Sequence, residues 1–172
     1  MTTRKTNNEN LTGKEAIEKM RKLIDKSGSC FFVTRSDIGA HHSRPMVVQK
    51  TDETGNVWFL SALASVKTLE LEQDSRVTLY FQGSSYADFL EINGHAVLSN
   101  DKNQVEDLWD PTMSAWFPNG KEDPNISVIQ FIPESGYYWD NKHGNAIAGI
   151  KMLVSAISGE QPDDQREGKL NP

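Results

Sequence analysis

The chain has 172 residues, of which 37% are hydrophobic and 9% aromatic, and it carries a formal net charge of −6. This length and hydrophobic content predict one globular domain with a sizeable core and exclude a disordered chain. The acidic balance disfavours general nucleic-acid binding, because that affinity comes mainly from Lys and Arg side chains on phosphates. A local basic pocket stays compatible with it.

The cysteine content and the first residues indicate the compartment. Cys30 is the single cysteine, which excludes an intrachain disulfide and fits a reducing environment. It opens the apolar run C-F-F-V, so we expect a buried structural thiol. The N-terminal residues are polar and lack the apolar stretch of a signal peptide, and no apolar run is long enough to span a membrane. We therefore expect a soluble, cytoplasmic protein.

In chain order, the first predicted elements are a tail and a helix. Residues 1–10 are polar and predict a disordered tail. Thr12 and Glu15 have the spacing of a capping box, and apolar residues then recur at helical spacing. Gly28 is a typical helix stop. These signals predict an amphipathic helix over residues 13–27.

Short strands dominate the middle of the chain. β-branched and aromatic residues bounded by turn signals predict strands over 30–35, 44–50, 57–61, 76–82, 86–100, 126–132 and 136–140. A loop over 36–43 precedes the second of these strands. The turn around Gly55 predicts that the strands on either side of it pair as a hairpin. Gly94 predicts a bulge or kink.

The remaining predicted elements are helical or irregular. Residues 65–73 predict a short helix with Ser65 as its N-cap and with Val66 and Leu69 buried. The other predicted segments are helices over 101–110 and 147–157, a Pro-punctuated loop over 110–125 with some helix near 114–117, and a mobile acidic tail over 159–172.

The order of these elements predicts the fold class. Strands joined by tight turns, rather than strands alternating with helices, disfavour a doubly wound parallel sheet. They favour a mainly β fold with peripheral helices, built as a small and mostly antiparallel barrel. We therefore predict one barrel domain over 11–158, between a disordered tail over 1–10 and a flexible acidic tail over 159–172.

The densest group of candidate ligand-binding residues lies within 44–73. Arg44 opens one strand, the next strand ends at Ser61, and Ser65 and Lys67 open a helix. This layout can gather a guanidinium, an ammonium, hydroxyls and free helix amides, which together bind phosphate well. The alternative is that both cations are ordinary solvated charges.

Several other residues have two possible roles. His41 and His42 are adjacent, so on an extended segment their rings point in opposite directions; we predict no metal site there and a place at the rim of a pocket. Trp116 and Phe117 lie in the Pro-punctuated loop, either as a lid over a ligand or as an anchor for the loop. Trp139 is expected in the core or in a subunit interface.

Three motifs, taken in order, carry a resemblance to a known family. The first is R-P-M-V-V-Q, followed after a Gly turn by V-W-F-L-S and then S-V-K-T-L. The second is F-L-E-I-N-G-H-A, and the third is W-F-P-N-G-K-E-D-P with Y-Y-W-D downstream. Over residues 11–157 the chain resembles the FMN-binding split-barrel family typified by pyridoxamine 5′-phosphate oxidase. Within that family it is most similar to the bacterial general stress proteins.

The resemblance implies a split β-barrel that binds FMN noncovalently in a groove between the two subunits of a homodimer. It implies that Arg44 opens the flavin-binding strand and that Lys67 binds the phosphate. The full set of predicted cofactor-binding residues is Arg44, Pro45, Met46, Val47, Phe59, Leu60, Ser61, Ser65, Lys67, Thr68 and Trp116. No residue is predicted as a catalytic acid or base.

Departures from the oxidase pattern affect the predicted activity. Gln49 and Val66 stand where that pattern has Lys and Arg, and its C-terminal substrate-binding Arg has no counterpart here. We therefore predict an FMN-dependent oxidoreductase that acts on a small molecule in a stress response, with an unassigned substrate. The alternatives are a non-catalytic protein that binds or sequesters FMN, and a relative that binds a deazaflavin or haem.

Overall fold

The computed structural model describes residues 7–35, 41–85, 87–141 and 165–172. Its helices are α1 (Gly13–Ser27), α2 (Val66–Gln73) and α3 (Lys102–Leu108), with two 3-10 helices, η1 (Pro111–Ala115) and η2 (Gly120–Glu122). Its strands are β1 (Asn7–Asn8), β2 (Leu11–Thr12), β3 (Ser29–Arg35), β4 (His41–Val47), β5 (Lys50–Thr51), β6 (Val57–Ala62), β7 (Arg76–Gln82), β8 (Phe89–Ser99), β9 (Ile126–Asn141) and β10 (Gln165–Asn171). The helix predicted over 147–157 lies outside the described residues.

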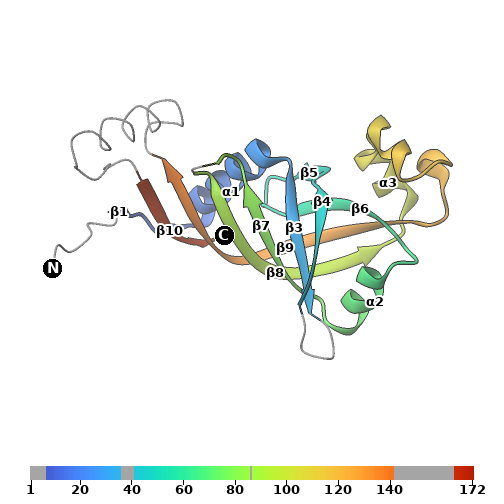
Figure 1. Cartoon of the computed structure of the whole chain (residues 1–172), viewed down its shortest axis with the longest axis horizontal. Helices are drawn as coiled ribbons and strands as arrows, with labels where there is room; N and C mark the ends of the chain where they lie inside the picture. Colours follow the sequence, from blue (N-terminus) through green and yellow to red (C-terminus); the bar gives the residue numbers. More distant parts are fainter. Residues whose placement is uncertain (1–6, 36–40, 86, 142–164) are drawn as a thin grey trace.

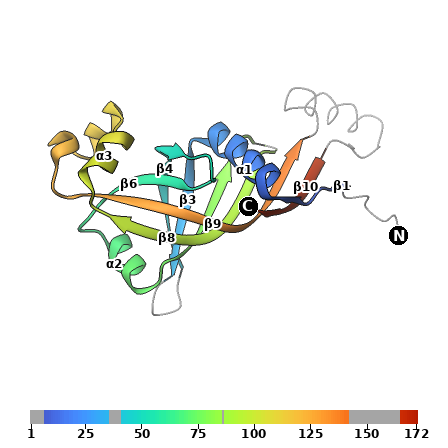
Figure 2. The same cartoon turned by 180° about the vertical axis from the view of Figure 1, so that it is seen from behind.

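A long antiparallel ribbon of β8 and β9 runs through the described fold (Figure 1). β9 has β8 along one edge. Its other edge pairs first with β6, over Ile126–Phe131, and then with β10, over Gly136–Asn141. From β8 the sheet continues through β7 and β3 to β4. Figure 2 shows the same arrangement from behind, with α1 lying across the sheet.

The curled sheet does not close into a complete barrel. Among the described strands, β4 pairs only with β3, and β6 pairs only with β9 and the short β5. The barrel therefore stays open between β4 and β6. The prediction of a mainly β, mostly antiparallel split barrel with peripheral helices is confirmed. The exceptions to the antiparallel pairing are β1 and β2, which pair with β10 in parallel.

A bulge at Gly94 shapes the β8–β9 ribbon. The register of the two strands shifts between Asn93 and Gly94, which confirms the predicted bulge. A Cβ atom at Gly94 would lie 2.1 Å from the backbone oxygen of Ile132. Only glycine therefore allows the two backbones to approach this closely. On either side, alternate residues of β8 such as Ile92 and Ala96 point into the core.

The main core lies between α1 and the inner face of the sheet. α1 buries an apolar stripe made of Ala16, Met20, Leu23 and Ile24. The helix ends where predicted, at Gly28, which has a φ of 66° and donates its N–H to the Ile24 carbonyl at 2.8 Å. Thr12 is the N-cap residue, but its side chain makes no capping hydrogen bond.

A second apolar cluster joins α3 and η1 to β6 and β9. Its buried members are Leu60, Val105, Leu108, Met113, Phe117, Ile126 and Val128. The predicted helix over 101–110 is thus confirmed as α3, and the helical part of the following loop begins earlier than predicted, at Pro111. No described helix is both long and apolar enough to cross a bilayer. The cytoplasmic location stays a prediction.

Three predicted strand boundaries are wrong. The predicted loop over 36–43 extends too far, because the ladder with β3 already includes His41. β4 ends at Val47, so the hairpin with β6 consists only of the short β5. The strands predicted over 126–132 and 136–140 form one strand, β9, because its pairing with β8 continues past the bulge.

The prediction of a flexible C-terminal tail is wrong for Gln165–Asn171, which form β10 beside β9. The predicted N-terminal tail likewise contains β1. The polar segment Gln165–Asn171 forms a strand because β9 offers it an open edge, and because Leu170 is fully buried in the main core. Gly168 also lets the N-terminal segment pass close by, since a Cβ atom there would lie 2.0 Å from the Glu9 carbonyl oxygen.

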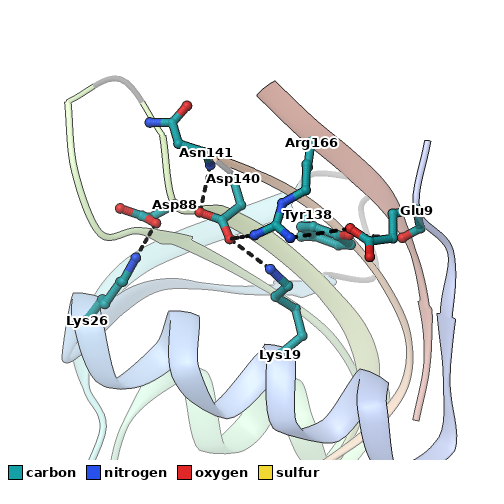
Figure 3. Close-up of polar contacts among 8 residues, drawn as sticks. All are labelled: Glu9, Lys19, Lys26, Asp88, Tyr138, Asp140, Asn141 and Arg166. Atoms are coloured by element: carbon teal, nitrogen blue, oxygen red, sulfur yellow. Dashed lines mark hydrogen bonds and ion pairs between the residues drawn. The ribbon is translucent and has the colours of Figure 1, made fainter. Parts of the chain in front are cut away.

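A group of charged side chains joins α1, β9 and β10 (Figure 3). The carboxylate of Asp140 is 4% exposed and accepts from the Lys19 ammonium at 2.7 Å and from Arg166 at 3.4 Å. Lys19 also lies 4.7 Å from the centre of the Tyr138 ring. The Tyr138 hydroxyl donates to the Glu9 carbonyl at 2.9 Å. Asp140 therefore ties the C-terminal strand to α1 and to the neighbouring strand.

Asp140→Asn is expected to destabilise the protein by about 3 kcal/mol, because it leaves two largely buried cations without their shared carboxylate. The midpoint of urea unfolding measures the effect. Glu106→Gln is the control: it breaks an exposed ion pair with Lys121 and should leave the midpoint unchanged. An unchanged midpoint for Asp140→Asn would show that this ion cluster does not hold the terminal strand.

Candidate functional site

α2 follows β6 after a loop of three residues (Figure 1), and its side chains reach both β6 and β4. Ser65 caps the helix as predicted: its hydroxyl accepts from the Thr68 N–H at 3.2 Å, and its carbonyl accepts from the Leu69 N–H at 3.2 Å. The Thr68 hydroxyl donates to the Ala62 carbonyl at 3.1 Å. These bonds hold the first turn of α2 against the end of β6.

α2 turns a mixed side toward the sheet, made of three polar side chains and of Leu71, which packs in the main core. Lys67, Thr68 and Glu70 are buried, whereas Val66 and Leu69 are 65% and 62% exposed. The prediction that Val66 and Leu69 are buried is therefore wrong. The physical reason is that the Ser65 cap and the hydrogen bonds of the buried polar side chains set the rotation of this short helix.

Lys67 is a buried cation in the first turn of α2. It is 7% exposed, and its ammonium donates to the Ser61 hydroxyl on β6. Within the described ranges, no carboxylate lies at ion-pair distance from it. Burial, and secondarily the positive charge of Arg44, lower the pKa of Lys67 to about 8. The site therefore holds a buried amine that has no carboxylate partner among the residues described.

Arg44 lies on β4 and is fixed by two acceptors. One terminal nitrogen, Nη1, donates to the Thr34 hydroxyl on β3 at 2.8 Å, and the other, Nη2, donates to Glu70 Oε2 on α2 at 2.8 Å. The Arg44 side chain is 22% exposed. Its remaining N–H donors are thus available beside Lys67, whose pKa its charge lowers.

Glu70 links three elements at the site. Its Oε2 also accepts from the Thr34 hydroxyl at 2.5 Å, and its Oε1 contacts the His42 ring at Nδ1. Burial by itself would raise the pKa of Glu70, but the bonds from Thr34, His42 and Arg44 together outweigh it and hold the pKa at about 2. Glu70 is therefore a carboxylate at all ordinary pH values.

Five of the predicted site residues come together here. Arg44, Ser61, Ser65, Lys67 and Thr68 lie around the start of α2 and the neighbouring strands. Thr34 and Glu70 were not predicted, and neither was the contact of His42 with Glu70. One signal was available for Glu70: it follows Lys67 by three positions, so both side chains lie on the same face of a helix.

The predicted residues of β4 alternate between two faces. Met46 packs against the main core, while Pro45 and Val47 point outward. Pro45 lines a hollow of about 510 Å³ on the outer face of the sheet, together with Phe31, Tyr80 and other residues. The side chains of these three residues therefore do not share one surface, whereas their backbone lies along the open edge of β4.

Phe59 and Leu60 contribute their side chains to apolar clusters and not to the site. Phe59 is fully buried and meets Phe32 edge to face, with ring centres 5.4 Å apart. Leu60 points to the other side of β6, into the second cluster. The strict alternation of a strand places them on opposite faces, and only Ser61, at the strand end, reaches Lys67.

The loop aromatics have separate places. Phe117 is buried in the second cluster and contacts Trp109, with ring centres 6.5 Å apart, so it anchors the loop. Trp116 is 62% exposed. Trp139 is 41% exposed and contacts Tyr137 on the outer face of β9. Contact of Trp116 with a cofactor stays a prediction.

Two further candidate groups have no reactive or metal-binding arrangement. Cys30 is buried as expected, and burial raises the pKa of its thiol to about 12, so it carries no thiolate at neutral pH. In the part of the chain that the structure describes, no group of His, Cys, Asp and Glu is arranged to hold a metal ion. His42 instead contacts Glu70.

Lys67→Met is expected to stabilise the ligand-free protein at about pH 7 by on the order of 1 kcal/mol or more, since it replaces a buried unpaired cation with an apolar chain of similar length. The pKa of Lys67 is lower in the folded than in the unfolded state, so the stability of the wild type rises with pH above about 8. The advantage of the variant should therefore shrink toward about pH 10.

Urea unfolding at both pH values measures this difference. Lys50→Met is the control, because it changes an exposed lysine on β5. A Lys67→Met protein that is less stable than the wild type at neutral pH would identify Lys67 as a structural donor to Ser61 rather than as a cation held for a ligand.

The comparisons with known proteins agree with this fold. Residues 15–163 match the family described as Pyridoxamine 5'-phosphate oxidase like. Protein bli-3 of Neurospora crassa is 28% identical over 134 residues, which cover 72% of this chain and 64% of that protein. The chain thus spans less than two thirds of the length of this curated relative.

Solved structures give the same result. The general stress FMN/FAD binding protein from Xanthomonas citri is 26% identical, with a TM-score of 0.62 over 72% of this chain and 87% of that chain. General Stress Protein 26 from Bacillus anthracis is 22% identical, with a TM-score of 0.63 over 71% of this chain and 92% of that chain, and so supports the fold alone. With its split barrel and a family match that extends over most of its length, the chain belongs to the pyridoxamine 5′-phosphate oxidase-like family.

Proposed function

We propose that this protein binds FMN noncovalently and uses it as an oxidoreductase on a small molecule. The observation that carries the proposal is Lys67, a buried ammonium without a carboxylate partner in the described ranges, beside the guanidinium of Arg44. A buried unpaired cation is costly, and an anionic ligand removes that cost. The phosphate of FMN is such an anion.

The surrounding groups fit a phosphate monoester. Arg44 uses one N–H at each terminal nitrogen for Thr34 and Glu70 and keeps further donors for a ligand. The hydroxyls of Ser61 and Thr68 lie beside the ammonium and the helix start. The first turn of α2 adds N–H groups and the positive end of the helix dipole. With Glu70 ionised, these charges sum to a positive site.

The flavin ring requires a flat apolar place with hydrogen-bonding groups at its border. The free edge of β4 offers backbone donors and acceptors from Arg44 to Val47, facing the opening between β4 and β6. These residues would hold the ring, in line with their predicted role. When bound, FMN supplies the hydride or electron transfer, and the protein binds and orients it. None of the described side chains is proposed as an acid or base.

Exposed apolar residues support a homodimer with the cofactor at the interface. Phe31 pairs across the strands with both Pro45 and Tyr80 on the outer sheet face. Phe31 is 58% exposed and Tyr80 45%. Contiguous apolar surface of this kind is typical of a subunit contact. We propose the stress-related role from the 26% identical relative that is named as a general stress FMN/FAD binding protein.

The phosphate site makes a direct prediction for binding. FMN should bind at least about tenfold more tightly than riboflavin, since charge-assisted hydrogen bonds to the phosphate contribute roughly 1.5–3 kcal/mol. Arg44→Ala should weaken FMN binding by about tenfold or more and leave riboflavin binding nearly unchanged. Quenching of flavin fluorescence during titration measures both dissociation constants, and Arg76→Ala, at an exposed arginine on β7, is the control.

Equal affinity of the wild type for FMN and riboflavin would contradict the phosphate site.

Measurements of turnover distinguish an oxidoreductase from a non-catalytic FMN-binding protein. NADH or NADPH oxidation with an artificial acceptor, faster than with free FMN, supports the oxidoreductase. Tight FMN binding without such turnover supports the non-catalytic, sequestering alternative, and a non-flavin chromophore in the purified protein supports a different cofactor.

A further inference from the structure

The buried carboxylate of Glu70 lies beside a site that is otherwise built for an anion. Its side chain is 7% exposed, and it follows Lys67 by one helical turn of α2. It accepts from Thr34 on β3, and from His42 and Arg44 on β4. A negative charge here opposes phosphate binding, so electrostatic attraction to the ligand does not explain its position.

The geometry at Arg44 gives Glu70 a function. Thr34 holds Nη1 at 2.8 Å and Glu70 holds Nη2 at 2.8 Å, so both ends of the planar guanidinium are fixed. Thr34 itself is fully buried and donates to the same carboxylate oxygen at 2.5 Å. The three groups form a closed set of hydrogen bonds. A guanidinium held in this way has one orientation, and its unused donors are pre-set for a planar anion.

Glu70 also fixes the distance between the two cations of the site. Its backbone belongs to α2, which carries Lys67, and its carboxylate accepts a hydrogen bond from the Arg44 side chain on β4. Because the sheet is open between β4 and β6, no ladder of backbone hydrogen bonds performs this task among the described strands. The carboxylate of Glu70 provides a direct link from α2 to β4.

We propose that Glu70 is a positioning residue, which orients Arg44 and ties it to α2 so that Arg44 and Lys67 bind one phosphate group together. This proposal rests on the proposed function. It makes the hydrogen-bonding shape of residue 70 more important than its charge. Glutamine keeps the shape and one carbonyl oxygen for Arg44 and Thr34, and its amide can donate to the His42 ring nitrogen. Alanine removes both.

The test compares Glu70→Gln with Glu70→Ala, and Glu72→Ala, at an exposed position of the same helix, is the control. The readout is the dissociation constant of riboflavin divided by that of FMN. This ratio isolates the contribution of the phosphate to binding. Glu70→Ala should lower this ratio by about tenfold with little change in riboflavin affinity. Glu70→Gln should keep the ratio within about threefold of the wild type.

A second readout needs no cofactor. In the ligand-free wild type, the side-chain N–H resonances of Arg44 should show a restrained guanidinium by nitrogen-15 NMR, with Arg44→Lys used for assignment. Glu70→Gln should retain this restraint and Glu70→Ala should lose it. Thermal unfolding of each variant confirms that the protein compared is folded.

The outcomes separate the two proposals. A wild type that binds riboflavin as tightly as it binds FMN contradicts the proposed function, whatever the NMR spectrum of Arg44 shows. A wild type that prefers FMN, together with a Glu70→Ala protein that keeps or increases this preference, overturns the positioning role. The same holds if Arg44 is equally restrained in the Glu70→Ala protein, or if Glu70→Gln loses as much phosphate preference as Glu70→Ala.

Discussion

The pairing of β8 with β9 is the interaction on which the rest of the molecule depends. β9 offers its second edge to β6 near its start and to β10 near its end, so one strand supports both the barrel and the terminal strands. The bulge at Gly94 lies between these two regions and requires a residue without a side chain. By fixing β6, this ribbon also fixes the place where α2 begins, and therefore where Lys67 enters the opening beside β4.

The candidate site shows how an incomplete barrel can serve binding. A closed sheet would have used the backbone groups of β4 and β6 for each other. Here the free edges remain, and buried polar side chains from α2 take over part of the linkage. Among the described residues Lys67 has no counter-ion, which lowers the stability of the protein, a cost typical of positions kept for binding rather than for folding. Glu70 forms an ion pair with Arg44 and so compensates the charge of that residue, whereas Lys67 bonds only to the neutral Ser61 hydroxyl among the described residues.

The sequence predicted those features that depend on local signals. The helix that ends at Gly28, the bulge at Gly94 and the Ser65 cap all follow from residues close together in the chain. The rotation of α2 could not be predicted, because Val66 and Leu69 face outward while Leu71 faces the core, and because the buried Glu70 finds its partners on β3 and β4, far away in sequence. β10 was missed for the same reason: its polar sequence is a strand because β9 offers an open edge and because Leu170 is buried in the main core.

The parallel pairing of β1 and β2 with β10 has a mechanical consequence. Asn7 pairs with Arg166 at the beginning of β10, and Thr12 pairs with Asn171 at its end. A force that pulls residues 7 and 171 apart would slide the paired strands along each other, so that it loads their hydrogen bonds together rather than one after another. The two ends of the described fold thus form a clamp that resists stretching in shear, and the buried Asp140 cluster anchors that clamp to α1.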